Sequence, residues 1–118
     1  MTNARFYYRV FDKIKPMIAQ GLTPPYFPGK PGALGEFLNN NLKYPDTSKA
    51  GGIVIIGFTV EIDGTLTGFR VAQSIGKDFD DEALRVLKIS PKWVPAKRDG
   101  KPIKSTFTQP IQFYIMNK

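Results

Sequence analysis

The densest group of side chains able to do chemistry is a run of acids. Asp78, Asp80, Asp81 and Glu82 place four carboxylates within five positions. Carboxylate oxygens are the ligands that Ca²⁺ and Mg²⁺ prefer, so a cation site is one interpretation. The other is structural, because acids at the start of a helix interact favourably with its positive dipole end. We favour the structural interpretation and predict no metal site.

Two residue types on which many enzymes depend are missing. The chain has no cysteine and no histidine. Disulfides, thiolate zinc sites, iron–sulfur clusters, cysteine nucleophiles and imidazole acid–base catalysis are therefore excluded. The sequence shows no carboxylate pair outside a helix start or a turn. We predict no catalytic residue, no cofactor and no enzymatic activity.

The charge balance favours anionic partners. Seventeen Lys and Arg face ten Asp and Glu, a formal net charge of +7. That sign favours nucleic acid, lipid head groups, cell-wall polymers or an acidic protein surface, without selecting among them. Five cations cluster around one expected turn: Lys92, Lys97, Arg98, Lys101 and Lys104. A solvated loop is one interpretation, and contact with an anionic surface through Lys97, Arg98, Lys101 and Lys104 is the other.

The single tryptophan decides between two uses of this basic turn. Trp93 lies beside it and is able to stack on a base, which gives the alternative of a basic nucleic-acid-binding module. A tryptophan between a helix and a strand, followed by Pro95, is more often a core residue. We predict that Trp93 lies in the core and expect no nucleic-acid partner.

The elements that position these side chains follow from hydrophobic periodicity. Helical spacing of apolar residues predicts helices at residues 32–42 and 79–89. Alternation predicts strands at residues 53–62, 66–74 and 103–115. With one apolar face on each element, the economical packing is an α+β fold of two layers, a three-stranded antiparallel sheet with two helices on one face.

Turn residues refine this outline. Asp63-Gly64 predicts a type I′ hairpin, which needs a positive φ at both residues. Gly68 predicts a β-bulge. Asp78 or Asp80 is expected to cap the second helix.

The first residues read differently from the rest of the chain. Aromatic and β-branched residues at 5–11 predict a short strand, and five prolines at residues 15–32 forbid a regular helix or a central strand there. We therefore divide the chain into a lead-in, residues 1–26, and a domain, residues 27–118. The first fifteen residues do not have the pattern of a signal peptide, and no stretch is long and apolar enough to span a bilayer.

The final strand is the best candidate for a binding site. Pro110 lacks a ladder donor, so this strand belongs at a sheet edge or carries a bulge. An exposed edge offers unpaired backbone groups to a partner peptide, or to the same edge of a second copy in a homodimer. Alternation places Ile103, Phe107, Ile111, Phe113 and Ile115 against the helices and Thr106, Thr108, Gln112 and Tyr114 on the open face. The predicted peptide-binding residues are Thr106, Thr108, Gln109, Gln112, Phe113 and Tyr114.

An ordered set of short motifs resembles the C-terminal domain of TonB, in the variety frequent in Bacteroidetes. The resemblance covers residues 27–115. The motifs are Phe27-Pro28-Gly29, Phe37-Leu38, Asn41-Leu42-Lys43-Tyr44-Pro45, Gly52, Asp63-Gly64, Phe69-x-Val71, Ser74, Asp81-Glu82-Ala83-Leu84, Pro91-Lys92-Trp93-x-Pro95, Gly100-Lys101-Pro102 and Pro110-x-x-Phe113.

The resemblance implies a periplasmic domain of an energy transducer anchored in the inner membrane. It implies two partners, the ExbB–ExbD proton-motive-force motor and the Ton box of an outer-membrane transporter, which adds as a strand beside the final strand. Peptidoglycan is a further candidate partner. Alternatives that keep the fold are a TonB-like domain on a sensor or peptidase, or a cell-wall-binding protein.

The sequence departs from the family in several places. The family's anchor helix and long proline-rich spacer are missing, so we expect that this chain alone does not transmit force and is a fragment or an orphan domain. Asp46-Thr47 stands where better-known members have Ala-Arg, and Gln20-Gly21 is not their Gln-Pro pair. The strand expected at residues 5–11 is additional, and one hypothesis is that it covers the edge that a Ton box needs.

Overall fold

The structure of the protein, a computed structural model, describes residues 19–45 and 51–114. The strand predicted at residues 5–11, the Asp46-Thr47 pair and Ile115 lie outside the described residues. In chain order the elements are β1 (Leu22–Thr23), α2 (Ala33–Asn41), β2 (Gly52–Val60), β3 (Leu66–Gln73), α3 (Lys77–Lys88), β4 (Ala96–Arg98), β5 (Lys101–Ile103) and β6 (Ser105–Phe113).

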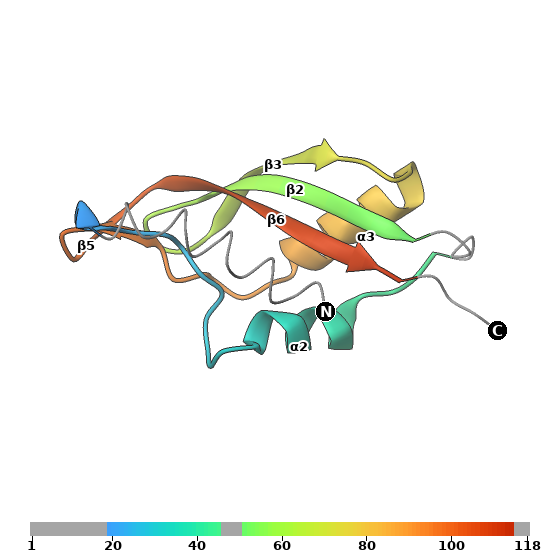
Figure 1. The fold of residues 1–118 in the computed structure, drawn as a ribbon, viewed down its shortest axis with the longest axis horizontal. Helices are drawn as coiled ribbons and strands as arrows, with labels where there is room; N and C mark the ends of the chain where they lie inside the picture. The colour runs from blue at the N-terminus through green and yellow to red at the C-terminus, as the bar shows by residue number, and fades with distance from the viewer. Residues whose placement is uncertain (1–18, 46–50, 115–118) are drawn as a thin grey trace.

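The main sheet is antiparallel with the strand order β3-β2-β6 (Figure 1). Apolar residues of both helices pack against one core cluster on one face of this sheet. The architecture is therefore the predicted α+β fold. A second, small antiparallel sheet, β1-β4-β5, was not predicted. It lies at one end of the main sheet, and β6 ends at the other (Figure 1).

The central strand β2 supplies most of the core. Val54, Ile56, Phe58 and Val60 are fully buried at every second position, as the alternation predicts. The buried residues of α3 that complete the core are Phe79, Ala83, Val86 and Leu87. Full burial of such an aliphatic or aromatic side chain stabilises the fold by about 1.5–3 kcal/mol. Packing against β2 thus holds α3 on this face.

The prediction for Trp93 is confirmed: it is a core residue with only 3% of its surface exposed. Its ring makes edge contacts with three phenylalanines from different parts of the chain. The ring-centroid distances are 5.2 Å to Phe58, 5.9 Å to Phe27 and 5.6 Å to Phe107. Phe27 is the first residue of the domain and precedes α2, so Trp93 joins the segment before α2 to β2 and β6.

The prediction of a type I′ turn at Asp63-Gly64 is wrong. The β2–β3 hairpin closes with a three-residue loop in which Gly64 donates to the Glu61 carbonyl, and Gly64 has φ +92° whereas Asp63 does not have a positive φ. The two-residue turn with both φ values positive is Asp99-Gly100, at +51° and +83°, between β4 and β5. A Cβ on Gly64 would lie 2.0 Å from the Trp93 carbonyl oxygen, so the chain needs glycine there.

Two further local predictions have opposite outcomes. Gly68 has φ +62° beside a shift in the β2–β3 register, which confirms the bulge. Neither Asp78 nor Asp80 caps α3, because its N-cap is Gly76. The Asp80 carboxylate instead accepts the Ser74 hydroxyl and the Ile75 N–H from the preceding loop.

The final strand is shorter than predicted. Ile103 ends β5, and β6 begins at Ser105, so Lys104 separates the two strands. The change arises because residues 96–103 fold back as the β4–β5 hairpin, which β1 joins through Leu22↔Arg98 and Thr23↔Lys97. Residues 22–23, within the described part of the lead-in, are thereby held by backbone pairing, and Tyr26 adds a bridge to Val94.

Replacing the tryptophan tests how much the aromatic cluster contributes. Trp93→Ala should lower the free energy of unfolding by about 3–5 kcal/mol, because it removes a buried ring and leaves a cavity. Urea denaturation measures this loss. Tyr26→Ala is the control, since that side chain is 55% exposed and should change stability by less than about 1 kcal/mol. Equal losses in the two variants would contradict the core assignment.

Candidate functional site

The outer side of β6 is a free sheet edge among the described residues. β6 pairs with β2 on one side, from Gly52↔Phe113 to Val60↔Ser105, with no shift in register. On its other side no described strand pairs with it. An antiparallel edge of this kind presents backbone donors and acceptors to solvent at every second residue.

Pro110 identifies which residues face outward. Its register with Ile55 is uninterrupted although it has no N–H, so its nitrogen must lie on the outer side of β6. Because backbone groups alternate between the two sides, Thr106, Thr108 and Gln112 also direct their N–H and C=O outward. The Tyr114 N–H has the same parity, and it does not bond to β2 but to the Tyr44 hydroxyl.

The side chains of β6 alternate largely as predicted. Thr106, Thr108, Gln112 and Tyr114 are exposed. Phe107 and Ile111 pack into the core. Of the six predicted peptide-binding residues, Phe113 is fully buried, so its side chain does not reach the edge.

Gln109 acts on the edge in a way that the sequence did not indicate. It shares the core-facing parity of Phe107 and is half-buried. Its side-chain amide donates to the Pro110 carbonyl at 2.9 Å. Since the Pro110 carbonyl is directed outward, Gln109 occupies one acceptor of the free edge.

Tyr44 is a residue of the edge that sequence reasoning missed as a site residue. Its hydroxyl accepts the Tyr114 N–H at 3.0 Å, and its ring packs edge-on against Phe113 with 5.4 Å between centroids. The two tyrosines are seventy positions apart. Only the motif Asn41 to Pro45 marked this segment in the sequence, and nothing in it indicated a contact with the final strand.

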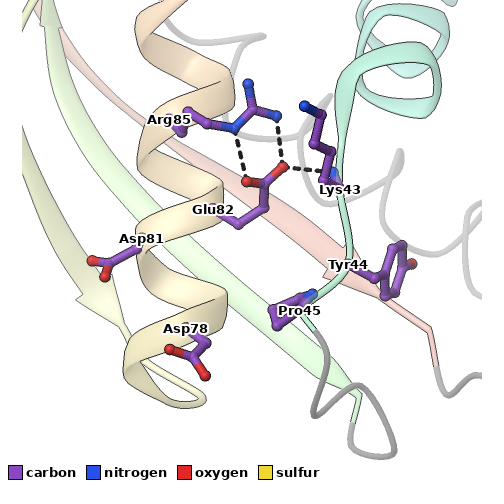
Figure 2. A pocket seen from close by; sticks show the side chains of 7 residues that line it. All are labelled: Lys43, Tyr44, Pro45, Asp78, Asp81, Glu82 and Arg85. Atoms are coloured by element: carbon purple, nitrogen blue, oxygen red, sulfur yellow. Dashed lines mark hydrogen bonds and ion pairs between the residues drawn. The ribbon is translucent and has the colours of Figure 1, made fainter.

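An open hollow lies between the segment after α2 and the helix α3 (Figure 2). Lys43, Tyr44 and Pro45 line one side, and the α3 side chains that line the other are Asp78, Asp81, Glu82 and Arg85. Glu82 accepts the Lys43 backbone N–H at 2.5 Å and bonds from Arg85 at 2.7 and 2.8 Å. Arg85 also donates to the Asn41 carbonyl at 2.7 Å. The pair therefore fastens the end of α2 to α3.

The hydrogen bonds of this pair affect its ionisation. Partial burial of Glu82 by itself raises the carboxyl pKa, but hydrogen bonds from Arg85 and from the Lys43 N–H outweigh it. The pKa of Glu82 is therefore below its usual value, which means that the folded protein favours the ionised carboxylate over the protonated carboxyl. The hydrogen bond to Glu82 correspondingly raises the pKa of Arg85.

The acidic run does not converge on one point. Asp80 faces the Ser74–Ile75 loop, Asp81 pairs with Lys77 at 2.7 Å, and Glu82 pairs with Arg85. Within residues 19–45 and 51–114 no group of three or more acidic side chains is placed to hold a metal ion.

The basic side chains gather on the β4–β5 hairpin. Arg98 and Lys101 are direct cross-strand partners, both exposed, and among the described residues neither has a carboxylate within ion-pair distance. Lys104 is paired loosely with Glu61 at 3.9 Å, and Lys97 is half-buried. Trp93 is buried in the core and presents no stacking surface, which removes the aromatic contact on which the nucleic-acid alternative depended.

The fold defines a small α+β domain whose last strand, β6, pairs with β2 without a register shift and has a free outer edge among the described residues. A family model described as Gram-negative bacterial TonB protein C-terminal matches residues 40–115. The chain belongs to this family. The match runs from the end of α2 through β6, whereas the resemblance in the sequence extended back to residue 27. Searches of curated proteins and of solved structures gave no match.

Membership of the family gives the class of function. Its domains are non-catalytic, transport-related modules that act with TonB-dependent transporters, and they are periplasmic in Gram-negative bacteria. In the part of the chain that the structure describes, no helix is long and apolar enough to cross a membrane.

The Glu82–Arg85 pair predicts a specific pH dependence of stability. The pKa of Glu82 is lower in the folded state than in the unfolded state, where it is near 4.5. The ionised carboxylate therefore stabilises the protein fully at pH values above the unfolded-state pKa. This contribution is lost as the pH falls through the folded-state pKa. Glu82→Gln should therefore cost about 1–3 kcal/mol at pH 7 and progressively less below pH 4.5. Urea denaturation of both proteins across this range measures the difference.

Asp81→Asn is the matched control on the same helix. Asp81 pairs with Lys77, but its side chain is 58% exposed, so the substitution should change stability by less than about 1 kcal/mol. A Glu82→Gln loss that stays constant from neutral to acidic pH would show that the carboxylate charge is not the cause.

Proposed function

We propose that this chain is the periplasmic domain of a TonB-type energy transducer, which binds the Ton box of an outer-membrane transporter by strand addition to the outer edge of β6. The observation that carries this proposal is the unbroken β2–β6 register through Pro110. It leaves an edge without a register shift, along which Thr106, Thr108 and Gln112 direct N–H and C=O groups outward for an added strand.

The structure behind the edge suits a binding strand. Phe107 and Ile111 fix β6 to the core from one face, while Thr106, Thr108 and Gln112 stand exposed on the other. Backbone pairing supplies affinity that tolerates different sequences, and the exposed threonines and glutamine are available for selectivity. In this proposal the domain passes a pull from the inner-membrane ExbB–ExbD motor, through an anchor, to the transporter.

The same edge is open to a second copy of the chain. A homodimer formed by two β6 strands would bury the groups that the Ton box needs, so the two occupants compete. We propose the peptide as the occupant, because each copy carries a formal net charge of +7 and two copies repel each other.

We also propose that the β4–β5 hairpin contacts acidic residues of the transporter next to its Ton box. Arg98 and Lys101 stand directly opposite each other, and like charges in that position destabilise a hairpin. An acidic partner would relieve the repulsion. The hairpin is continuous with β6, since only Lys104 lies between β5 and β6.

Proline substitutions test the edge. Thr108→Pro removes an outward donor and bars close approach of a strand, and it leaves the bonds to β2 intact. Binding of a Ton-box peptide from a transporter of the same genome, measured by calorimetry, should weaken by about tenfold or more. Thr108→Ala should change it by no more than about twofold, because the backbone is unaltered.

Val71→Pro is the matched control on the opposite edge of the same sheet. Val71 pairs with Ile56, whose backbone groups face β6, so the Val71 N–H also points away from the sheet. Circular dichroism should first show that each variant is folded. Loss of binding in Val71→Pro with full binding in Thr108→Pro would place the partner at β3 and overturn the proposal.

Charge removal tests the hairpin. Arg98→Gln combined with Lys101→Gln should weaken binding of a Ton-box peptide with acidic flanks by about two- to fivefold and reduce its salt dependence. Lys30→Gln combined with Lys77→Gln removes the same charge elsewhere and should leave binding unchanged. Equal effects of the two pairs would mean that only net charge matters. Tighter, strongly salt-dependent binding to an oligonucleotide would favour the nucleic-acid alternative.

A further inference from the structure

The free edge of β6 has a defined end. Its outward N–H groups at Thr106, Thr108 and Gln112 have no backbone partner among the described residues, but the next one, at Tyr114, is already bonded to the Tyr44 hydroxyl at 3.0 Å. Tyr44 comes from the segment after α2, far from β6 in sequence. A side chain thus occupies the position that the next backbone acceptor of an added strand would take.

Tyr44 is held in this position from two sides. On one side its ring packs edge-on against the fully buried Phe113. On the other, the residue before it donates its N–H to Glu82. Arg85 bonds both to Glu82 and to the Asn41 carbonyl, so the whole turn after α2 is fixed on α3 (Figure 2). The hydroxyl is therefore preorganised at the edge.

A partner strand gains nothing by displacing Tyr44. It would exchange one hydrogen bond at the Tyr114 N–H for another, and it would lose the contact between the two rings. At Thr106, Thr108 and Gln112, by contrast, each bond formed replaces only a bond to water.

We propose that Tyr44 ends the docking edge and limits the paired segment of a partner to residues 106–112 of β6. This inference rests on the proposed function, and it assigns a specificity role to Tyr44: the partner is a short extended segment, and residues beyond it leave the sheet. Glu82 and Arg85 are positioning residues that act through Tyr44.

Tyr44→Phe is the direct test, because it removes only the hydroxyl and keeps the ring on Phe113. Ton-box peptides are lengthened at either end in steps of two residues, the repeat of outward-facing groups along a strand. In the parent, affinity should rise until the peptide spans residues 106–112 and then stay constant. In Tyr44→Phe, one further two-residue extension at one end should raise the affinity roughly two- to tenfold, which is the contribution of one backbone hydrogen bond.

Tyr26→Phe is the matched control. Tyr26 is 55% exposed, and its backbone bridge to Val94 does not depend on its hydroxyl. It should show the parent's length profile. Tyr114 amide exchange, followed by NMR without any peptide, should accelerate by about tenfold in Tyr44→Phe and not in Tyr26→Phe.

The outcomes distinguish failure of the length limit from failure of the proposed function. Identical length profiles in the parent and Tyr44→Phe overturn only the limit of pairing to residues 106–112, and so does an unchanged exchange rate of the Tyr114 amide. Failure of every peptide to bind the parent overturns the proposed function and the limit with it.

Discussion

The missing backbone N–H of Pro110 is the constraint on which the orientation of β6, and with it the proposed binding edge, depends. A proline inside a paired strand is compatible with an intact ladder only when its nitrogen faces away from the neighbouring strand. Since the β2–β6 register is continuous through Pro110, this one residue sets the parity of the whole strand. The same parity places Phe107 and Ile111 in the core and leaves Thr106, Thr108 and Gln112 at the edge.

The rigidity of that edge comes from the core behind it. β6 is one of the two edge strands of the sheet, so it depends on β2 and on the aromatic cluster around Trp93 for its position. Phe107 of β6 and Phe58 of β2 both touch Trp93, whose backbone in turn donates to the Gly64 carbonyl at 2.9 Å. The β2–β3 hairpin loop, the segment before α2 and β6 therefore meet at Trp93.

The sequence allowed the main sheet, both helices and the edge position of the last strand to be predicted. Each depends on a local signal: the alternation of Val54, Ile56, Phe58 and Val60, the helical spacing of apolar residues, and a proline within a strand. These signals are strong because side-chain period and backbone geometry are directly linked. The candidate edge residues with exposed side chains, such as Thr108 and Gln112, follow from the same rule.

The small sheet and the role of Tyr44 depend instead on contacts between distant segments. β1 contains two residues and is a strand only because the β4–β5 hairpin lies beside it. Two Asp-Gly pairs occur, and the type I′ turn forms at Asp99-Gly100 because the β2–β3 loop must pass against Trp93 and takes a three-residue form. The Tyr44 hydroxyl has no sequence signal, since its partner is a backbone N–H seventy positions away.

An exposed strand edge is an aggregation hazard for any protein, and several features of β6 limit it. Pro110 removes one donor, the Gln109 amide covers one acceptor, and the Tyr44 hydroxyl closes one end. Each of these makes the edge less regular for an indefinite stack of strands. What remains is a short run of donors and acceptors on a chain with a net charge of +7, which repels its own copies and attracts acidic segments. The local features that discourage self-association are thus the same ones that, in our proposal, limit how much of a partner strand pairs with β6.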